Sequence, residues 1–240
     1  MIKDIKTVMW KERKGLLRYR GSRSRFLLTM LSPLFLAVWM PLEVGRDWTE
    51  GPPSILISAV IPIILVAITV PDSFAGERER NTLQTLLASR LPDRAILFGK
   101  LAVGVAFSWG LTLFTLLLGL VVVNVAHADG EILFYTPTVG LANLALSFLM
   151  STLCAGAGVL VSMRSETVQE ATQTLSAIFL VPPMLLQFVF FALRDQLRDV
   201  LRELNGEQVL LIVVGVLALV DLLVFLAALR RFQRSRLVLD

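Results

Sequence analysis

The chain is poor in the residues from which catalytic and metal sites are built. Among its 240 residues it has one cysteine, Cys154, and one histidine, His127. This excludes an intrachain disulfide and a zinc cage of several His and Cys ligands. The sequence also lacks the motifs G-x-x-x-x-G-K-[ST], H-E-x-x-H and G-x-S-x-G. We therefore expect no enzyme activity, and no metal or cofactor bound by this chain.

Charged residues are scarce as well. They make up 18% of the chain, whereas a soluble domain has about 25%. Apolar residues make up 55%, and the mean hydropathy is +0.73. The net charge of +4 is distributed as in a membrane protein rather than in a nucleic-acid binder, so we expect no nucleic-acid partner. Composition thus predicts an integral membrane protein.

Six apolar stretches are long enough to cross a hydrocarbon core of about 30 Å as helices. Their predicted bounds are 26–44, 54–75, 100–125, 137–163, 171–193 and 208–229. The stretches lack the alternation of a barrel strand, which favours helices. Pro33, Pro41 and Pro62 predict kinks in the first two. The predicted fold class is an all-α membrane protein with six transmembrane helices.

Lys and Arg positions predict the orientation. With the N-terminus inside, the inner segments hold 19 of the 23 basic residues. Basic residues favour the cytoplasmic side. We therefore expect both termini in the cytoplasm, in a multi-pass protein of the prokaryotic cytoplasmic (inner) membrane.

Two flanking segments are expected to lie at the membrane surface, outside the six spans. In the N-terminal segment, 1–25, Ile2, Ile5, Met9 and Leu16 share one helical face, and most of the basic residues lie off it. This pattern predicts an amphipathic interfacial helix, the alternative being a solvated basic arm. Leucines at helical spacing predict a short outer helix at 194–205, ended by Asn205-Gly206. The remaining chain, 26–240, forms the predicted transmembrane domain.

The loop between the second and third spans, 76–99, is the most informative segment. Asn81 is predicted to cap a short helix, with Gln84 completing a capping box. Leu83, Leu86 and Leu87 then line one helical face, and a charge cluster of Glu77, Arg78, Glu79 and Arg80 precedes them. A leucine face on such a loop needs a surface to bury against, either the membrane or another protein.

This loop resembles the signature of ABC-2 type permeases, the membrane subunits of type V ATP-binding-cassette exporters. The resemblance rests on Glu77-Arg78-Glu79, Asn81-Thr82-Leu83, Leu86-Leu87-Ala88-Ser89 and Ile96-Leu97-Phe98-Gly99-Lys100. Asn81 stands where the family often has glycine, and Arg90 where a proline is common. Asn readily tolerates a left-handed backbone.

The resemblance implies that this loop forms a cytoplasmic coupling helix, which docks on a separate ATPase subunit that binds ATP and Mg. A second copy of the chain, or a homologous permease, would complete the translocation path within membrane lipid. The implied coupling residues come from the loop and from a second, shorter one: Glu77, Arg78, Glu79, Arg80, Thr82, Leu83, Leu86, Leu87, Ser89, Arg90, Arg164 and Glu166.

A few polar residues fall within the predicted spans. Asp221 is a costly ionisable group at depth, and such groups often mark a transport path. Its alternative role is to pair with a polar group on another helix. Asn143 and Gln187 are further path candidates, although hydrogen bonds between helices explain them equally. Two other functions stay open, an ion-coupled secondary transporter that uses Asp221 and a membrane assembly protein without transport.

Overall fold

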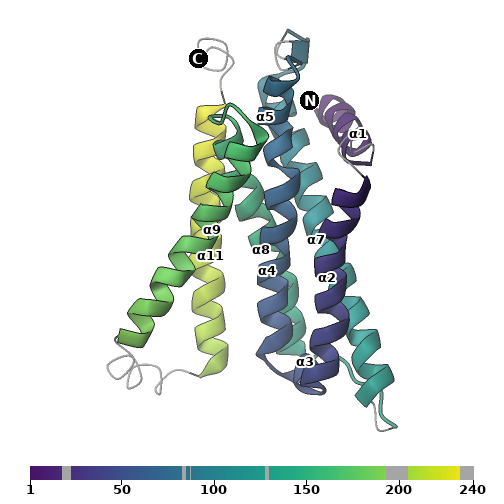
Figure 1. Cartoon of the computed structure of the whole chain (residues 1–240). Helices are drawn as coiled ribbons and strands as arrows, with labels where there is room; N and C mark the ends of the chain where they lie inside the picture. The colour runs from purple at the N-terminus through teal and green to yellow at the C-terminus, as the bar shows by residue number, and fades with distance from the viewer. Residues whose placement is uncertain (18–22, 83–84, 87, 128–129, 193–204, 233–240) are drawn as a thin grey trace.

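The computed structural model describes residues 1–17, 23–82, 85–86, 88–127, 130–192 and 205–232. The regular elements within these ranges are all helices, which confirms the predicted all-α class. They are α1 (Ile2–Leu17), α2 (Arg23–Val44), α3 (Asp47–Glu50), α4 (Pro52–Thr69), α5 (Pro71–Glu79), α7 (Asp93–His127), α8 (Pro137–Ser162), α9 (Val168–Ala192) and α11 (Gly206–Arg231). The long helices run between two ends of the molecule, one marked by α5 and the other by α3 (Figure 1).

Prolines and caps explain several helix starts. Pro52 and Pro53 open α4, and Pro137 opens α8, where a missing N–H is not costly. The Thr136 hydroxyl caps α8 by accepting a hydrogen bond from the Val139 amide at 3.4 Å. Pro71 separates α4 from α5, so the predicted second span, 54–75, is divided near its end.

Helix α8 lies at the centre and packs mainly against α4 and α11. Small residues allow this close approach. A Cβ atom on Gly158 would lie 2.8 Å from the Val70 side chain, and one on Gly156 would lie 3.0 Å from Val224 of α11. Cys154 and Ala155, directly before Gly156, are fully buried. Small residues are the usual means of close packing between membrane helices.

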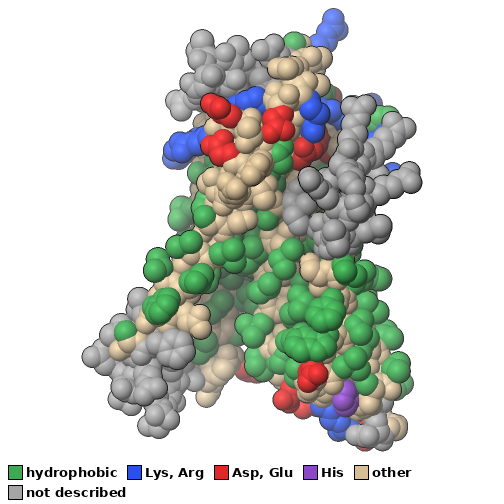
Figure 2. Space-filling model, in the orientation of Figure 1, with side chains coloured by type: hydrophobic (Ala, Val, Ile, Leu, Met, Phe, Trp, Pro, Cys, Tyr) green, Lys and Arg blue, Asp and Glu red, His purple; other side chains and the backbone are tan. Residues whose placement is uncertain are grey.

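Four stretches of the described chain are long and apolar enough to span a membrane: Pro52–Glu79, Asp93–His127, Pro137–Ser162 and Gly206–Arg231. A shorter apolar stretch, Met30–Val44, lies in α2. The predicted fifth span, 171–193, corresponds to α9 and is neither confirmed nor excluded by this criterion. On the face in Figure 2, apolar side chains cover the middle of the molecule, and charged ones gather at its two ends.

The predicted N-terminal helix corresponds to α1, which packs against α7. Val8 of this helix is buried, 1% exposed, whereas Ile2 and Trp10 are exposed. The helix therefore has an inner face towards the chain itself, in addition to the surface face that its amphipathic pattern predicts. Most of the predicted outer helix, 194–205, lies outside the described residues. Asn205 is the N-cap of α11, and its amide donates to Gln208 Oε1 at 3.1 Å. Whether it also ends a helix at 194–204 stays a prediction.

Candidate functional site

The signature segment lies at the α5 end of the molecule, where α5 is bound to the end of α8. Ser162 Oγ accepts hydrogen bonds from the amides of Phe74 (3.3 Å) and Ala75 (2.9 Å). The same hydroxyl donates to the Pro71 carbonyl at 2.8 Å. One buried serine thus joins the first turns of α5 to the end of α8.

The second short loop, 163–167, is held by the charge cluster of α5. Arg78 donates to the carbonyls of Ser165 (2.8 Å) and Met163 (2.9 Å). Glu79 Oε1 accepts from the Val168 amide at 2.8 Å, at the start of α9. The residues predicted from two separate loops therefore meet at one end of the molecule, and Arg164 and Glu166 lie exposed beside them.

Asn81 has a different role from the predicted one. Its φ is +55°, and it ends α5 rather than capping a following helix. The amide of Asn81 donates to Arg78 O at 3.0 Å, and that of Thr82 donates to Glu77 O at 2.9 Å. This is the Schellman pattern, which requires a left-handed residue and accepts Asn in place of glycine. The N-cap prediction was wrong, and Gln84 lies outside the described residues.

The described leucine of the loop faces the chain's own core. Leu86 is 8% exposed and packs in a cluster with Phe74, Ile96 and Leu97. Its amide donates to Thr82 O at 3.1 Å, and Ser89 Oγ donates to Leu86 O at 2.6 Å. Leu83 and Leu87, predicted on the same face, lie outside the described residues. The outer surface here is polar, with Glu79, Arg80, Thr82, Thr85 and Arg90 exposed.

Glu77 is buried within a network of charges that joins three helices. Its Oε1 lies 2.6 Å from Lys11 Nζ of α1, and its Oε2 lies 3.3 Å from Lys100 Nζ of α7. Lys100 Nζ also lies 2.9 Å from Glu12 Oε1 and donates to Ser73 O at 2.6 Å. The Lys100 side chain is 0% exposed and that of Glu77 is 8% exposed. Two cations and two anions balance, as buried charges require.

Gly99 explains how α1 comes close enough for these contacts. A Cβ atom at Gly99 would lie 2.6 Å from the Val8 side chain, closer than packed atoms approach. Only glycine therefore allows α1 to rest on α7 at this point. We call Glu12, Glu77, Lys100 and the Val8–Gly99 contact the α1 clamp.

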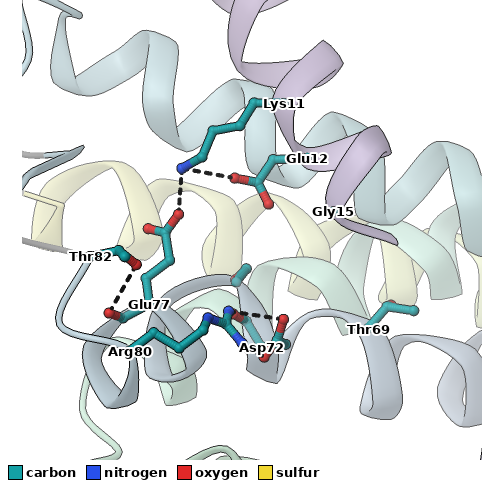
Figure 3. Close-up of a pocket in the computed structure, with 9 residues that line it drawn as sticks. Lys11, Glu12, Gly15, Thr69, Asp72, Glu77, Arg80 and Thr82 are labelled. Carbon is teal, nitrogen blue, oxygen red and sulfur yellow. Dashed lines mark hydrogen bonds and ion pairs between the residues drawn. The ribbon is translucent and has the colours of Figure 1, made fainter. Parts of the chain in front are cut away.

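A cavity of about 230 Å³ lies beside the α1 clamp, lined by residues of α1, the end of α4, α5 and the two positions Arg80 and Thr82 after it (Figure 3). On its opposite wall Arg80 Nη1 lies 2.9 Å from Asp72 Oδ1, an exposed pair that passes over Gly76. This hydrogen bond raises the pKa of Arg80 above its ordinary value. The charged side chains that line the cavity are therefore already paired with one another.

The three path candidates are not brought together. Asp221 of α11 accepts a hydrogen bond from Thr152 Oγ1 of α8 at 2.6 Å. Asn143 of α8 is buried and donates to Ser54 Oγ of α4 at 3.1 Å. Gln187 is exposed on α9. Each of the first two joins a pair of helices, which is the alternative that their sequence positions left open.

The family model described as ABC-2 family transporter protein matches residues 2–202. The chain belongs to this family. It is therefore a multi-pass integral membrane protein of a permease-type transporter. No curated protein matches the chain.

Sequence reasoning missed Lys11, Glu12 and Asp72 as members of the site, and it treated Lys100 only as the end of the signature. One available signal was that Lys100 opens a long apolar run. A lysine at such a position needs an acidic partner or a path to water.

Proposed function

We propose that this chain is the membrane subunit of an ATP-driven exporter and couples its translocation path to a separate ATPase. The observation that carries the proposal is the joining of both short loops at the α5 end by Arg78 and Glu79. A force applied to either loop reaches α5, α8 and α9 through these bonds. The chain has no P-loop motif, so ATP and Mg would be held by the partner.

The charge distribution supports placing the α5 end in the cytoplasm. Described basic residues at this end include Lys3, Lys6, Arg78, Arg94, Arg164 and Arg230. The α3 end is mainly acidic, with Glu43, Asp47, Glu50, Glu131 and Glu207. An excess of Lys and Arg on one side favours the cytoplasmic orientation of that side. α1 and the last turn of α11 share the α5 end (Figure 1), as expected for six spans with both termini inside.

The residues exposed at the α5 end are only part of the set predicted to contact an ATPase. Leu86 is buried in the chain's own core and Glu77 in the α1 clamp, so neither is exposed to a partner. The exposed residues Thr85, Arg90, Arg164 and Glu166 would form the docking surface. Charged side chains at such a surface set partner choice and orientation more than affinity. A second copy of the chain, or a homologous permease, would complete the path.

The docking surface is tested by reversing its charges. We expect Arg90→Glu combined with Arg164→Glu to abolish stimulation of the ATPase by the permease, because acidic groups would replace the basic ones that face it. The matched control is Glu131→Arg, a charge reversal at the exposed part of the α3 end. Reconstituted ATPase activity is the measurement. Unchanged activity in the double variant would exclude this surface as the coupling site.

Asp221 has a sufficient structural role in its hydrogen bond to Thr152, which joins α11 to α8. None of the described contacts favours ion-coupled transport through Asp221. The ion-coupled and the ATPase-coupled mechanisms also predict different results. The ion-coupled mechanism requires transport without ATP that is lost in Asp221→Asn, whereas the ATPase-coupled mechanism requires ATP in both proteins.

A further inference from the structure

We propose that Lys100 is a positioning residue that fastens α1 to both ends of the signature loop, so that α1 and the loop move as one body. Glu77 stands at the start of this loop and Lys100 at its end, and Lys100 also reaches Glu12 of α1. The charged ends of the signature are thus directed at the N-terminal helix of their own chain.

The contacts of Lys100 connect more elements than a simple ion pair does. Its ammonium group lies within 3.3 Å of Glu12 Oε1, the Ser73 carbonyl and Glu77 Oε2. These partners belong to α1 and α5, while Lys100 itself belongs to α7. Lys100 donates hydrogen bonds to Glu12 Oε1 and to Ser73 O, and its contact with Glu77 Oε2 is an ion pair without a hydrogen bond. Lys11 Nζ also lies near both carboxylates, 4.0 Å from Glu12 and 2.6 Å from Glu77, but its side chain is 50% exposed, whereas that of Lys100 is fully buried.

The contacts of Lys100 are made by groups that are largely shielded from water. The Lys100 side chain is 0% exposed, and the Glu12 side chain is 19% exposed. Removing one member of a buried ion pair leaves the other charge without compensation, whereas removing both can be nearly neutral. The α1 clamp therefore allows stability and positioning to be separated by mutation.

The outer face of α1 has the composition of a membrane-binding helix. Ile2 and Trp10 are exposed there together with Lys3, Lys6 and Arg13. A basic helix with exposed apolar side chains binds an anionic membrane surface. Because the α1 clamp joins α1 to the signature loop, the depth of α1 at the membrane surface would set the position of the loop relative to the membrane. This consequence for coupling rests on the proposed function, whereas the fastening itself does not.

The test uses the full chain without any ATPase, in nanodiscs. Cys154 is replaced by alanine, and spin labels are placed on Lys6 of α1 and on Arg164, both exposed. Arg164 is a suitable reference because Arg78 holds the carbonyls on both sides of it. Distance distributions are compared for the parent, Lys100→Met, Lys100→Met with Glu12→Gln, and Lys14→Met. Lys14 lies 3.7 Å from the Trp10 ring centre, outside the α1 clamp, and serves as the control.

We expect Lys100→Met to lower the apparent Tm by roughly 10 °C, because Glu12 loses its buried cation. Adding Glu12→Gln should restore most of this loss. Both Lys100 variants should broaden the label distance distribution, whereas Lys14→Met should keep the parent's narrow one. A restored Tm with a broad distribution identifies a positioning role that a purely stabilising residue would not show.

A narrow, parent-like distribution in the double variant would overturn the proposal, even if Lys100→Met alone fails to fold. Because the chain is measured alone, this failure is distinguishable from failure of the proposed function, which would appear as the absence of an ATPase partner.

Discussion

The two ends of the molecule are held by different chemistry. The α5 end relies on buried charges, in which Lys100 and Glu77 have almost no contact with water. The α3 end relies on neutral groups. The indole of Trp48, fully buried, donates to Tyr135 Oη at 2.9 Å, and this hydroxyl donates to Leu116 O at 2.9 Å.

Other contacts at the α3 end follow the same neutral pattern. The Asn124 side chain donates to Leu133 O at 2.9 Å and accepts from the Leu133 amide at 2.7 Å. The amide of Thr136 donates to Thr49 O at 3.1 Å. Burial raises the pKa of Tyr135, so its hydroxyl stays protonated and able to donate. These groups close one end of the bundle without any charged member.

Under the proposed function the α5 end transmits force, whereas the α3 end closes the bundle, and the difference in chemistry agrees with these two roles. Neutral hydrogen bonds tolerate the loss of one partner better than buried ion pairs do. Buried charges instead demand that all partners stay together, which suits segments that move as a unit. The comparison predicts that single changes at the α5 end disturb distant helices, while those at the α3 end act locally.

After Lys100→Met, the largest expected effect comes from two glycines of α7, Gly99 towards the α5 end and Gly119 towards the α3 end. Gly99→Ala and Gly119→Ala should each destabilise the chain by about 1–3 kcal/mol, because the new methyl groups would lie 2.6 Å from Val8 and 2.7 Å from Trp48. Thermal unfolding in detergent measures both. Only Gly99→Ala should also displace α1, which the Lys6–Arg164 label distance reports.

Gly110→Ala is the matched control on the same helix, since nothing lies within 4 Å of its added methyl group. It should be neutral or stabilising by up to about 1 kcal/mol, because alanine is the better helix former. Equal destabilisation by all three substitutions would mean that close helix contacts at Gly99 and Gly119 are not what sets the effect.

Tyr135→Phe is expected to be smaller, about 1 kcal/mol, since it removes the hydroxyl that connects Trp48 to Leu116 but leaves the ring in place. The label distance at the α5 end should not change. A long-range change in that distance, measured in the same nanodiscs, would contradict the local character assigned to the α3 end.

The smallest effect is expected for Arg80→Gln, which breaks the exposed pair with Asp72. Exposed pairs contribute less than about 1 kcal/mol and are screened by salt. Unfolding measured at low and high ionic strength should show this difference shrinking with salt. Lys100→Met should keep its effect at high salt, and a screened effect there would show that the α1 clamp is open to solvent.

Most of the architecture was predictable from sequence, for physical reasons. Apolar runs long enough to span a bilayer predicted α7, α8 and α11 closely, because the membrane leaves few alternatives to helices. Pro71 was the main local feature overlooked, and it divides the predicted second span. The six-span count remains a prediction, because it requires α2 and α9 to span the membrane as well.

The site was less predictable, because helical periodicity does not say which surface a face meets. The leucine face of the loop was assigned to a partner, yet Leu86 packs on Phe74 and Ile96 of its own chain. Two expectations attached to Asn81, a helix N-cap role and, at the position of a family glycine, tolerance of a left-handed backbone. The noted match to a family glycine indicated the second, which its φ of +55° confirms.

The most direct measurement of the central claim is co-purification from native membranes under mild detergent, with the partner identified by mass spectrometry. The account predicts that an ATPase with a P-loop is recovered with the parent chain and with Glu131→Arg, and that it is lost in the Arg90→Glu, Arg164→Glu variant. Recovery of the parent chain without any such ATPase, together with transport that proceeds in the absence of ATP, would contradict it.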